Sequence, residues 1–371
     1  MVIHTDDGLI TGLDSTAGSS GEVHDLRPYT VVPGLIDSHV HLTWSGLAVP
    51  NEISNQESDE LSLLRGVANA AAHLRAGITA VRDLGSRRGT ALHLAAATRL
   101  GIITAPEIVA SGNLIAMTGG HAHYLGVQAD GPWAVTKAVR TELAAGAGVI
   151  KIMASEGLFG IDEDPRVPQF EIEELRAGAQ AAHRAGKTIA AHAYGAAAIT
   201  NALAAGVDTV EHGAHLEPDQ AEKMASSGTI FVPTLSTYHS YTTKADALGF
   251  NSQMRATAHE TYDRARHAVH LAQQHKVAIA AGTDAGVPGQ PHGALATELR
   301  LLVDAGLSPA EALRAATVTG AAALNLSTTR GRLTPGMTAD LIALDGNPLE
   351  DITATARVRT VVQCGRIATK K

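Results

Sequence analysis

The chain has 371 residues, of which 45% are hydrophobic and 18% charged, and its formal net charge at pH 7 is -8. This composition is far from that of disordered proteins and fits one large α/β domain, alone or with a small satellite. The negative charge and the lack of a basic run argue against an electrostatic grip on nucleic acid or an anionic membrane, so the expected partner is a small-molecule substrate. The single cysteine, Cys364, excludes an internal disulfide framework and a cysteine-based zinc cluster.

The two ends of the chain lack long helical patterns. Residues 1–32 and 331–371 are rich in short β-type runs and turn residues, so we expect them to pair into one small β-domain beside a main domain over residues 33–330. The first residues, MVIHTDDGLITG, lack the basic and then apolar pattern of a signal peptide, and no apolar run reaches transmembrane length. We therefore expect a cytoplasmic protein, either a monomer or a homo-oligomer.

Between the ends, a unit recurs that consists of an alanine-rich amphipathic segment, a glycine and a short aliphatic run, as in AHLRAGITAVRDLG and NALAAGVDTVEHG. The glycine is typical of a helix end, and the aliphatic run is typical of a buried parallel strand. Such units predict a (β/α)₈ barrel of the TIM type, although an open doubly wound sheet would show the same alternation. The strand candidates are residues 34–42, 77–85, 107–112, 148–154, 188–193, 209–213, 229–236 and 277–286.

Possible metal ligands fall at the ends of these strand candidates. His39 and His41 are two residues apart, so on a strand both imidazoles would point to the same face. In a barrel of parallel strands the carboxyl ends meet at one face, where such enzymes place their chemistry. The residues that would meet there are His39, His41, Lys151, His192, His212 and Asp284.

Lys151 lies in the aliphatic run GVIKIMA, where it would be buried. A buried lysine without a partner is rare, and one interpretation is that its head reaches the strand end while its stem packs. The alternative is that loss of solvent keeps the amine neutral, so that it reacts with carbon dioxide and becomes a carbamate. That carboxylate on a long arm could bridge two cations.

These motifs are similar to those of the amidohydrolase superfamily, in its imidazolonepropionase-like and prolidase-like (Xaa-Pro dipeptidase-type) branch. The similarity covers nearly the whole chain and keeps the order of the motifs. The matching stretches are PGLIDSHVHL, GITAVRDLG, MTGGHAHYLG, VIKIMASEG, AAHAYG, VEHG, AGTDAG and LTPGMTADLIALDGNPLEDI.

The resemblance implies a (β/α)₈ barrel with a small β-sandwich formed by both termini, and a centre of two divalent metal ions, usually zinc. It assigns His39, His41 and Asp284 to one ion and His192 and His212 to the other, with N6-carboxylated Lys151 bridging them. The resemblance also places His121 and Tyr194 at positions that bind the substrate carbonyl or carboxylate. The segment between GGHAHYLG and the strand of Lys151 is shorter than in prolidase-like relatives, which bears on the choice of substrate.

The leading functional hypothesis is metal-dependent hydrolysis of an amide in a dipeptide or an N-acyl amino acid. In it, a water shared by the two ions supplies hydroxide near neutral pH, and Asp284 relays the proton to the leaving nitrogen. The alternative is hydrolysis of a cyclic C–N bond or deamination, as in imidazolonepropionase, which does not need a bridging lysine. Aromatic residues make up only 3% of the chain, so we expect little stacking material for large planar substrates.

Overall fold

The computed structural model describes residues 1–14, 21–158 and 163–370. Its centre is made of short parallel strands that are buried on both faces, as their aliphatic sequences predict. One sheet has the order β4-β5-β6 and the other the order β12-β11-β10-β9-β7-β8. The bounds are β4 (Leu35–Val40), β5 (Ile78–Asp83), β6 (Glu107–Ala110), β7 (Leu114–Ala116), β8 (Gly126–Gln128), β9 (Val149–Met153), β10 (Thr188–Ala193), β11 (Thr209–His212) and β12 (Ile230–Val232).

Backbone contacts connect both edges of the three-stranded sheet to the six-stranded one. The Gly148 N–H donates to the Ala110 carbonyl at 2.9 Å, which joins β6 to the start of β9. On the other side, the segment at residues 277–286 forms one parallel bridge to the end of β4, between Val40 and Ala285, and another to β12, between Phe231 and Ile279.

The prediction of a regular strand at residues 277–286 was wrong, because only isolated bridges form there. Asp284 has a φ of 55° and Gly286 a φ of 107°, so the backbone leaves the extended conformation on both sides of Ala285, the residue that bridges to β4. A Cβ atom at Gly286 would lie 2.5 Å from the His41 carbonyl oxygen, and one at Gly282 would lie 2.9 Å from the His39 Cβ atom. The glycines of AGTDAG therefore allow this segment to approach β4 closely.

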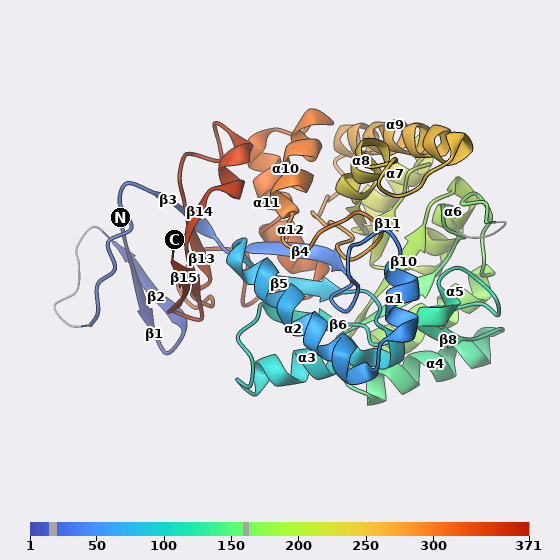
Figure 1. Ribbon diagram of the computed structural model, residues 1–371, viewed down its shortest axis with the longest axis horizontal. Helices are drawn as coiled ribbons and strands as arrows, with labels where there is room; N and C mark the ends of the chain where they lie inside the picture. Colours follow the sequence, from blue (N-terminus) through green and yellow to red (C-terminus); the bar gives the residue numbers. More distant parts are fainter. Residues whose placement is uncertain (15–20, 159–162, 371) are drawn as a thin grey trace.

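Helices surround the central strands, as Figure 1 shows. In α5, for example, Leu175, Ala179 and Ala182 form a buried stripe at helical spacing, and Glu171 and Glu174 form a capping box at the start. The helices are α1 (Pro50–Gln56), α2 (Asp59–Arg75), α3 (Thr90–Arg99), α4 (Pro132–Ala144), α5 (Ile172–Arg184), α6 (Ala196–Ala205), α7 (Pro218–Ser227), α8 (Leu235–Thr243), α9 (Ser252–Gln274), α10 (Leu295–Asp304), α11 (Pro309–Ala315) and α12 (Val318–Ala323). In the part of the chain that is described, no helix combines the length and the apolar character needed to cross a membrane.

The two ends of the chain lie side by side in short antiparallel sheets, at the left of Figure 1. One sheet pairs β1 (Val2–Asp6) with β2 (Leu9–Asp14). The other has the order β15-β14-β13-β3, with β3 (Thr30–Pro33), β13 (Leu341–Leu344), β14 (Val358–Gln363) and β15 (Arg366–Lys370). A bridge between Leu9 and Thr338 connects the two sheets, so β-type pairing between the ends is present as expected.

The segment at residues 116–132 is more ordered than the predicted loop. It holds the end of β7, a short 3₁₀ turn at His123–Leu125 and strand β8, which pairs with β7 in parallel. Two further 3₁₀ turns occur at Arg87–Gly89 and Ile352–Ala356.

Candidate metal centre

Parallel strand ends bring the predicted ligands to one edge of the sheets. His39 is the second-last residue of β4, with His41 just beyond it, His192 is the second-last residue of β10, and His212 ends β11. Lys151 lies in the middle of β9, where its longer side chain starts deeper than the imidazoles.

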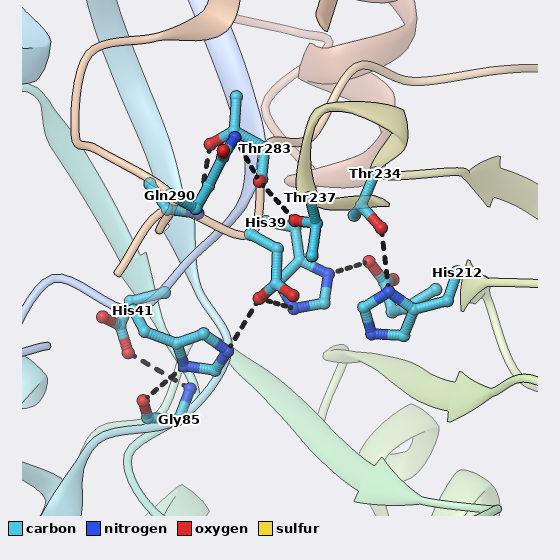
Figure 2. A network of polar contacts seen from close by, with 12 residues as sticks. His39, His41, Gly85, His212, Thr234, Thr237, Thr283 and Gln290 are labelled. Carbon is cyan, nitrogen blue, oxygen red and sulfur yellow. Dashed lines mark hydrogen bonds and ion pairs between the residues drawn. The ribbon is translucent and has the colours of Figure 1, made fainter. Parts of the chain in front are cut away.

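His39, His212 and Asp284 form a compact buried group. One candidate ligand atom from each of the three side chains lies within 4.8 Å of the others. His41 adjoins this group, since its Nε2 atom lies 3.3 Å from Oδ1 of Asp284, while Nε2 of His39 lies 3.4 Å from the same oxygen. Figure 2 shows the His39, His41 and His212 imidazoles gathered around one centre.

The remaining histidine, His192, joins the group by ring contacts. Its ring centroid lies 4.7 Å from that of His212, which in turn lies 5.1 Å from that of His39. Four imidazoles therefore form a continuous row above the sheets. The group within 4.8 Å, however, mixes residues that the resemblance assigns to different ions.

Hydrogen bonds to one ring nitrogen fix which nitrogen remains for a metal. The Nδ1 atoms of His39, His41 and His212 bond to a Glu211 oxygen at 2.8 Å, the Gly85 carbonyl at 2.8 Å and the Thr234 hydroxyl at 2.9 Å. Their Nε2 atoms are left to face the centre. His192 is the reverse case, because its Nε2 atom bonds to the Glu156 carbonyl at 3.3 Å and Nδ1 is left over. Such outer partners set the tautomer and orientation of histidines that bind metals.

Burial sets the protonation of the group. It lowers the pKa of His39 and His192 well below the ordinary value and that of His212 to about 3, which favours the neutral imidazole that binds metals. Burial alone would raise the pKa of Asp284, but His39 and His41 outweigh this effect and hold the pKa below its ordinary value. Burial would lower the pKa of His41 too, but Asp284 outweighs it and raises that pKa above the ordinary value. His39, His192 and His212 therefore offer neutral nitrogens, and Asp284 offers an ionised carboxylate.

Lys151 is 2% exposed, and its Nζ atom has no hydrogen-bond partner among the described residues. Burial lowers its pKa from 10.5 to about 8, so about a tenth of the amine is neutral at pH 7, far more than for an exposed lysine. The prediction that Lys151 is buried in this strand is confirmed.

The predicted substrate-binding residues lie against the histidine row. The Tyr194 ring stacks on that of His212 with centroids 4.8 Å apart, and the His121 ring stacks on that of His192 at 4.7 Å. Nδ1 of His121 lies 2.9 Å from a Glu163 oxygen, which holds the ring in place. His123 instead bonds to the Gly120 carbonyl at 2.8 Å.

Aromatic side chains gather at this site despite their low share of the sequence. The Trp44 ring centroid lies 5.6 Å from that of His41. It lies 6.3 Å from that of Tyr124, with the two rings parallel. Tyr238 meets Tyr194 edge to face at 6.0 Å. Composition does not reveal where the few rings lie; the expectation of little stacking material for large planar substrates stays a prediction. His292 holds the Trp44 backbone in place, since its Nε2 atom bonds to the Trp44 carbonyl at 2.8 Å.

Several buried charged residues that support the ligands were not singled out from the sequence. Glu211 bonds to His39, Arg82 bonds to Glu211 at 2.8 Å, and Asp37 accepts the Thr283 hydroxyl at 2.7 Å beside Asp284. All three charged side chains are 0% exposed. A signal was present, since each is a charged residue inside an aliphatic run, as Lys151 is.

Comparison with known proteins identifies the family. The sequence profile described as the amidohydrolase family matches residues 30–368. The chain belongs to the amidohydrolase family. Ochratoxinase of Aspergillus niger is 31% identical over 362 aligned positions, covering 88% of this chain and 72% of the relative. Imidazolonepropionase of Deinococcus deserti is 29% identical over 401 positions, covering 97% and 90%.

Among solved structures, a Xaa-Pro dipeptidase with methionine bound in its active site has 31% identity and a TM-score of 0.89, and the match covers 99% of this chain and 94% of that one. The predicted superfamily is confirmed. As an amidohydrolase, the chain has an α/β fold of the TIM-barrel type and is a hydrolase that acts on C–N bonds, in a family that typically uses metal ions.

Proposed function

We propose that this amidohydrolase uses two divalent metal ions, most simply zinc, to cleave the amide bond of a dipeptide or an N-acyl amino acid. The observation that carries the proposal is the buried Lys151 amine, which has no partner among the described residues although four imidazoles and a carboxylate surround the same centre. Such an unpaired amine is costly in a protein interior unless a further group completes it.

Carbon dioxide supplies that group. The neutral Lys151 amine attacks the carbon atom, an N–C bond forms, one C–O π pair moves onto oxygen and the amine proton leaves. The product would be an N6-carboxylated lysine, a further carboxylate ligand for the metal centre. His39, His41 and Asp284 would hold the first ion and His192 and His212 the second, through the ring nitrogens that the hydrogen bonds leave over.

Imidazole nitrogen and carboxylate oxygen are ligands that zinc prefers. When bound, two zinc ions would polarise a carbonyl group and lower the pKa of water toward neutrality. The chain's own contribution is proton transfer and orientation. Asp284, ionised and next to two imidazoles, takes the proton that the attack releases and delivers it to the leaving nitrogen.

His121 and Tyr194 would orient the substrate through its carbonyl or carboxylate oxygen. Both rings are fixed, His121 by Glu163 and Tyr194 by its stack on His212, so their polar atoms are held close to the proposed ions. A leaving part with a free carboxylate is consistent with the related dipeptidase structure that holds methionine, a free amino acid, in its active site.

We further propose that β4, β5, β6, β9, β10, β11 and β12 close into one barrel, with residues 277–286 as its eighth member and residues 33–330 as its extent. In the same proposal, residues 1–32 and 331–371 form a separate small β-sandwich. The supporting observations are the backbone contacts at both edges of the three-stranded sheet and the bridge between Leu9 and Thr338.

A substrate panel tests the proposed activity. Zinc-loaded protein is assayed on dipeptides and N-acyl amino acids, on the C-terminal amides of the same compounds, and on imidazolonepropionate and cytosine. Turnover of the free acids, with amides at least about tenfold slower in kcat/KM, supports the proposal. Equal rates on acids and amides would refute carboxylate recognition, and turnover of the cyclic compounds alone would move the protein to the imidazolonepropionase-like class.

A further inference from the structure

An ion pair is buried beneath the metal centre, between two strands that belong to different sheets. Arg82 on β5 donates to Oε1 of Glu211 on β11 at 2.8 Å, and both side chains are 0% exposed. Arg82 also donates to the Ser38 carbonyl at 2.7 Å, the Thr209 hydroxyl at 3.1 Å and the Ala323 carbonyl at 3.2 Å. The guanidinium is therefore well satisfied, as a buried charge must be.

Both oxygens of Glu211 accept hydrogen bonds. Its Oε2 atom accepts from Nδ1 of His39 at 2.8 Å, while Oε1 receives both Arg82 and the Thr209 hydroxyl. Of the four histidines in the centre, His39 alone has a carboxylate group as the partner of its outer ring nitrogen; the other three use a hydroxyl or backbone carbonyls there. A carboxylate on the outer nitrogen fixes the ring and makes the inner nitrogen a stronger ligand.

Lys151 lies close to this ion pair. Lys151 and Thr209 are both in register with Ala190, one on each neighbouring strand. Among the charges near Lys151, Glu211 raises its pKa and Arg82 lowers it. Glu211 is therefore a carboxylate with which a protonated Lys151 would pair. This pairing is not made, since the Lys151 Nζ atom has no hydrogen-bond partner among the described residues.

We infer that Arg82 and Glu211 are positioning residues of the metal centre, with two separable effects. Glu211 holds His39 with its Nε2 atom toward the ion, and Arg82 occupies Glu211 so that it does not pair with Lys151, which leaves that amine free to react with carbon dioxide. The inference rests on the proposed binuclear centre and adds the residues that make it form.

Three variants separate the two effects. Glu211→Gln keeps an acceptor for His39 but removes the charge. Arg82→Met leaves Glu211 ionised and free to pair with Lys151. The double variant removes both charges, so that Lys151 is unpaired again. Arg330→Met is the matched control, because Arg330 forms a partly buried ion pair with Asp340 next to the terminal sheets, away from the centre.

Each protein is measured by thermal melting, by elemental analysis for metal content, by chelator competition for zinc affinity and by ¹³C NMR after incubation with ¹³C-bicarbonate for the lysine carbamate. For Glu211→Gln we expect the carbamate signal of the parent and zinc affinity about 10- to 100-fold weaker. For Arg82→Met we expect loss of the carbamate signal and of at least one ion per chain. The double variant should regain the carbamate signal but keep the weak affinity of Glu211→Gln.

Carbamate signals are compared with melting temperatures, because removing both charges of a buried ion pair can restore stability by itself. The decisive result is that Arg82→Met loses the carbamate signal at a melting temperature no lower than that of Glu211→Gln, and that the double variant regains it. The inference is wrong if Arg82→Met keeps the parent's carbamate and metal content, if the double variant is as defective as Arg82→Met, or if Glu211→Gln binds zinc like the parent. If Arg82→Met does not fold, Glu211→Gln and the double variant still decide on the same measurements. A parent protein without two metals would refute the proposed centre instead, while the carbamate signals would still test the effect of Arg82.

Discussion

Asp284 and His41 meet at the centre of the site, with Oδ1 of the aspartate 3.3 Å from Nε2 of the histidine. Two backbone hydrogen bonds produce this contact: the His41 N–H donates to the Ala285 carbonyl at 2.8 Å, and the Asp284 N–H donates to the His39 carbonyl at 2.7 Å. The left-handed backbone of Asp284, with a φ of 55°, turns its carboxylate toward the histidines. The main chain itself therefore positions the carboxylate for proton transfer.

Asp284→Asn should keep most of the metal and lose most of the activity. An amide oxygen can still coordinate, but it cannot accept and return a proton, and general acid and base catalysis contributes roughly 10²- to 10⁴-fold in rate. Steady-state kinetics and elemental analysis of the same preparation check this, with Asp304→Asn, an exposed change on α10, as the control. A variant within about threefold of the parent's kcat would contradict the role.

Lys151→Ala should fold but lose most of its activity and part of its metal, because the bridging carboxylate is gone and a small residue replaces a buried one. A short carboxylic acid such as propionate, added in excess, should restore part of both by occupying the space of the carbamate. Lys137→Ala, on the exposed side of α4, should behave like the parent with and without the acid. Full activity and metal content in Lys151→Ala would rule out the bridging lysine.

Tyr194→Phe should impair the use of substrates with a free carboxylate. Removing the hydroxyl takes away one hydrogen bond to a charged oxygen, which is worth about 1.5–3 kcal/mol, or roughly 10- to 100-fold in kcat/KM. The matching C-terminal amide substrates should be affected less. Tyr262→Phe, half-buried on α9, is the control. An equal loss on acids and amides would show that Tyr194 does not read the carboxylate.

Glu298 should make stability fall with pH. Its carboxylate is buried and accepts the backbone N–H groups of Leu235 and Ser236, and burial raises its pKa from 4.5 to about 7. Because the folded state holds this proton more tightly, the contribution is complete below pH about 4.5 and is lost as the pH rises through about 7.

Glu298→Gln lacks this titration, so its free energy of unfolding relative to the parent should rise between pH 5 and pH 8. Urea unfolding of both proteins at several pH values gives this difference, and Glu260→Gln, an exposed change on α9, should leave it flat. A constant difference between parent and Glu298→Gln would show that Glu298 is not protonated in the folded protein at pH 5.

The ligand positions could be predicted because they depend on local patterns. Aliphatic runs marked the strands, and the polar residues at their ends, from His39 to Asp284, lie together in the structure as parallel strands require. The buried environment of Lys151 followed from its four aliphatic neighbours in the same way.

The supporting contacts could not be predicted, because they join strands that are distant along the chain. Whether Glu211 would face His39, Arg82 or solvent depends on the register between sheets, which a single sequence does not give. The same holds for the Trp44 and Tyr124 stack, which joins the end of β4 to a short 3₁₀ turn. The last central segment was misassigned because Asp284 and Gly286 have positive φ, which a pattern of aliphatic residues does not reveal.

The number of metal ions per chain tests the central claim most directly. The protein is purified without chelators, saturated with zinc in the presence of bicarbonate, dialysed and analysed for metal against protein concentration from amino-acid analysis. The proposed centre, with four imidazoles, Asp284 and carboxylated Lys151, requires about two ions per chain. A reproducible value of one ion or none, in protein that melts cooperatively, would contradict it.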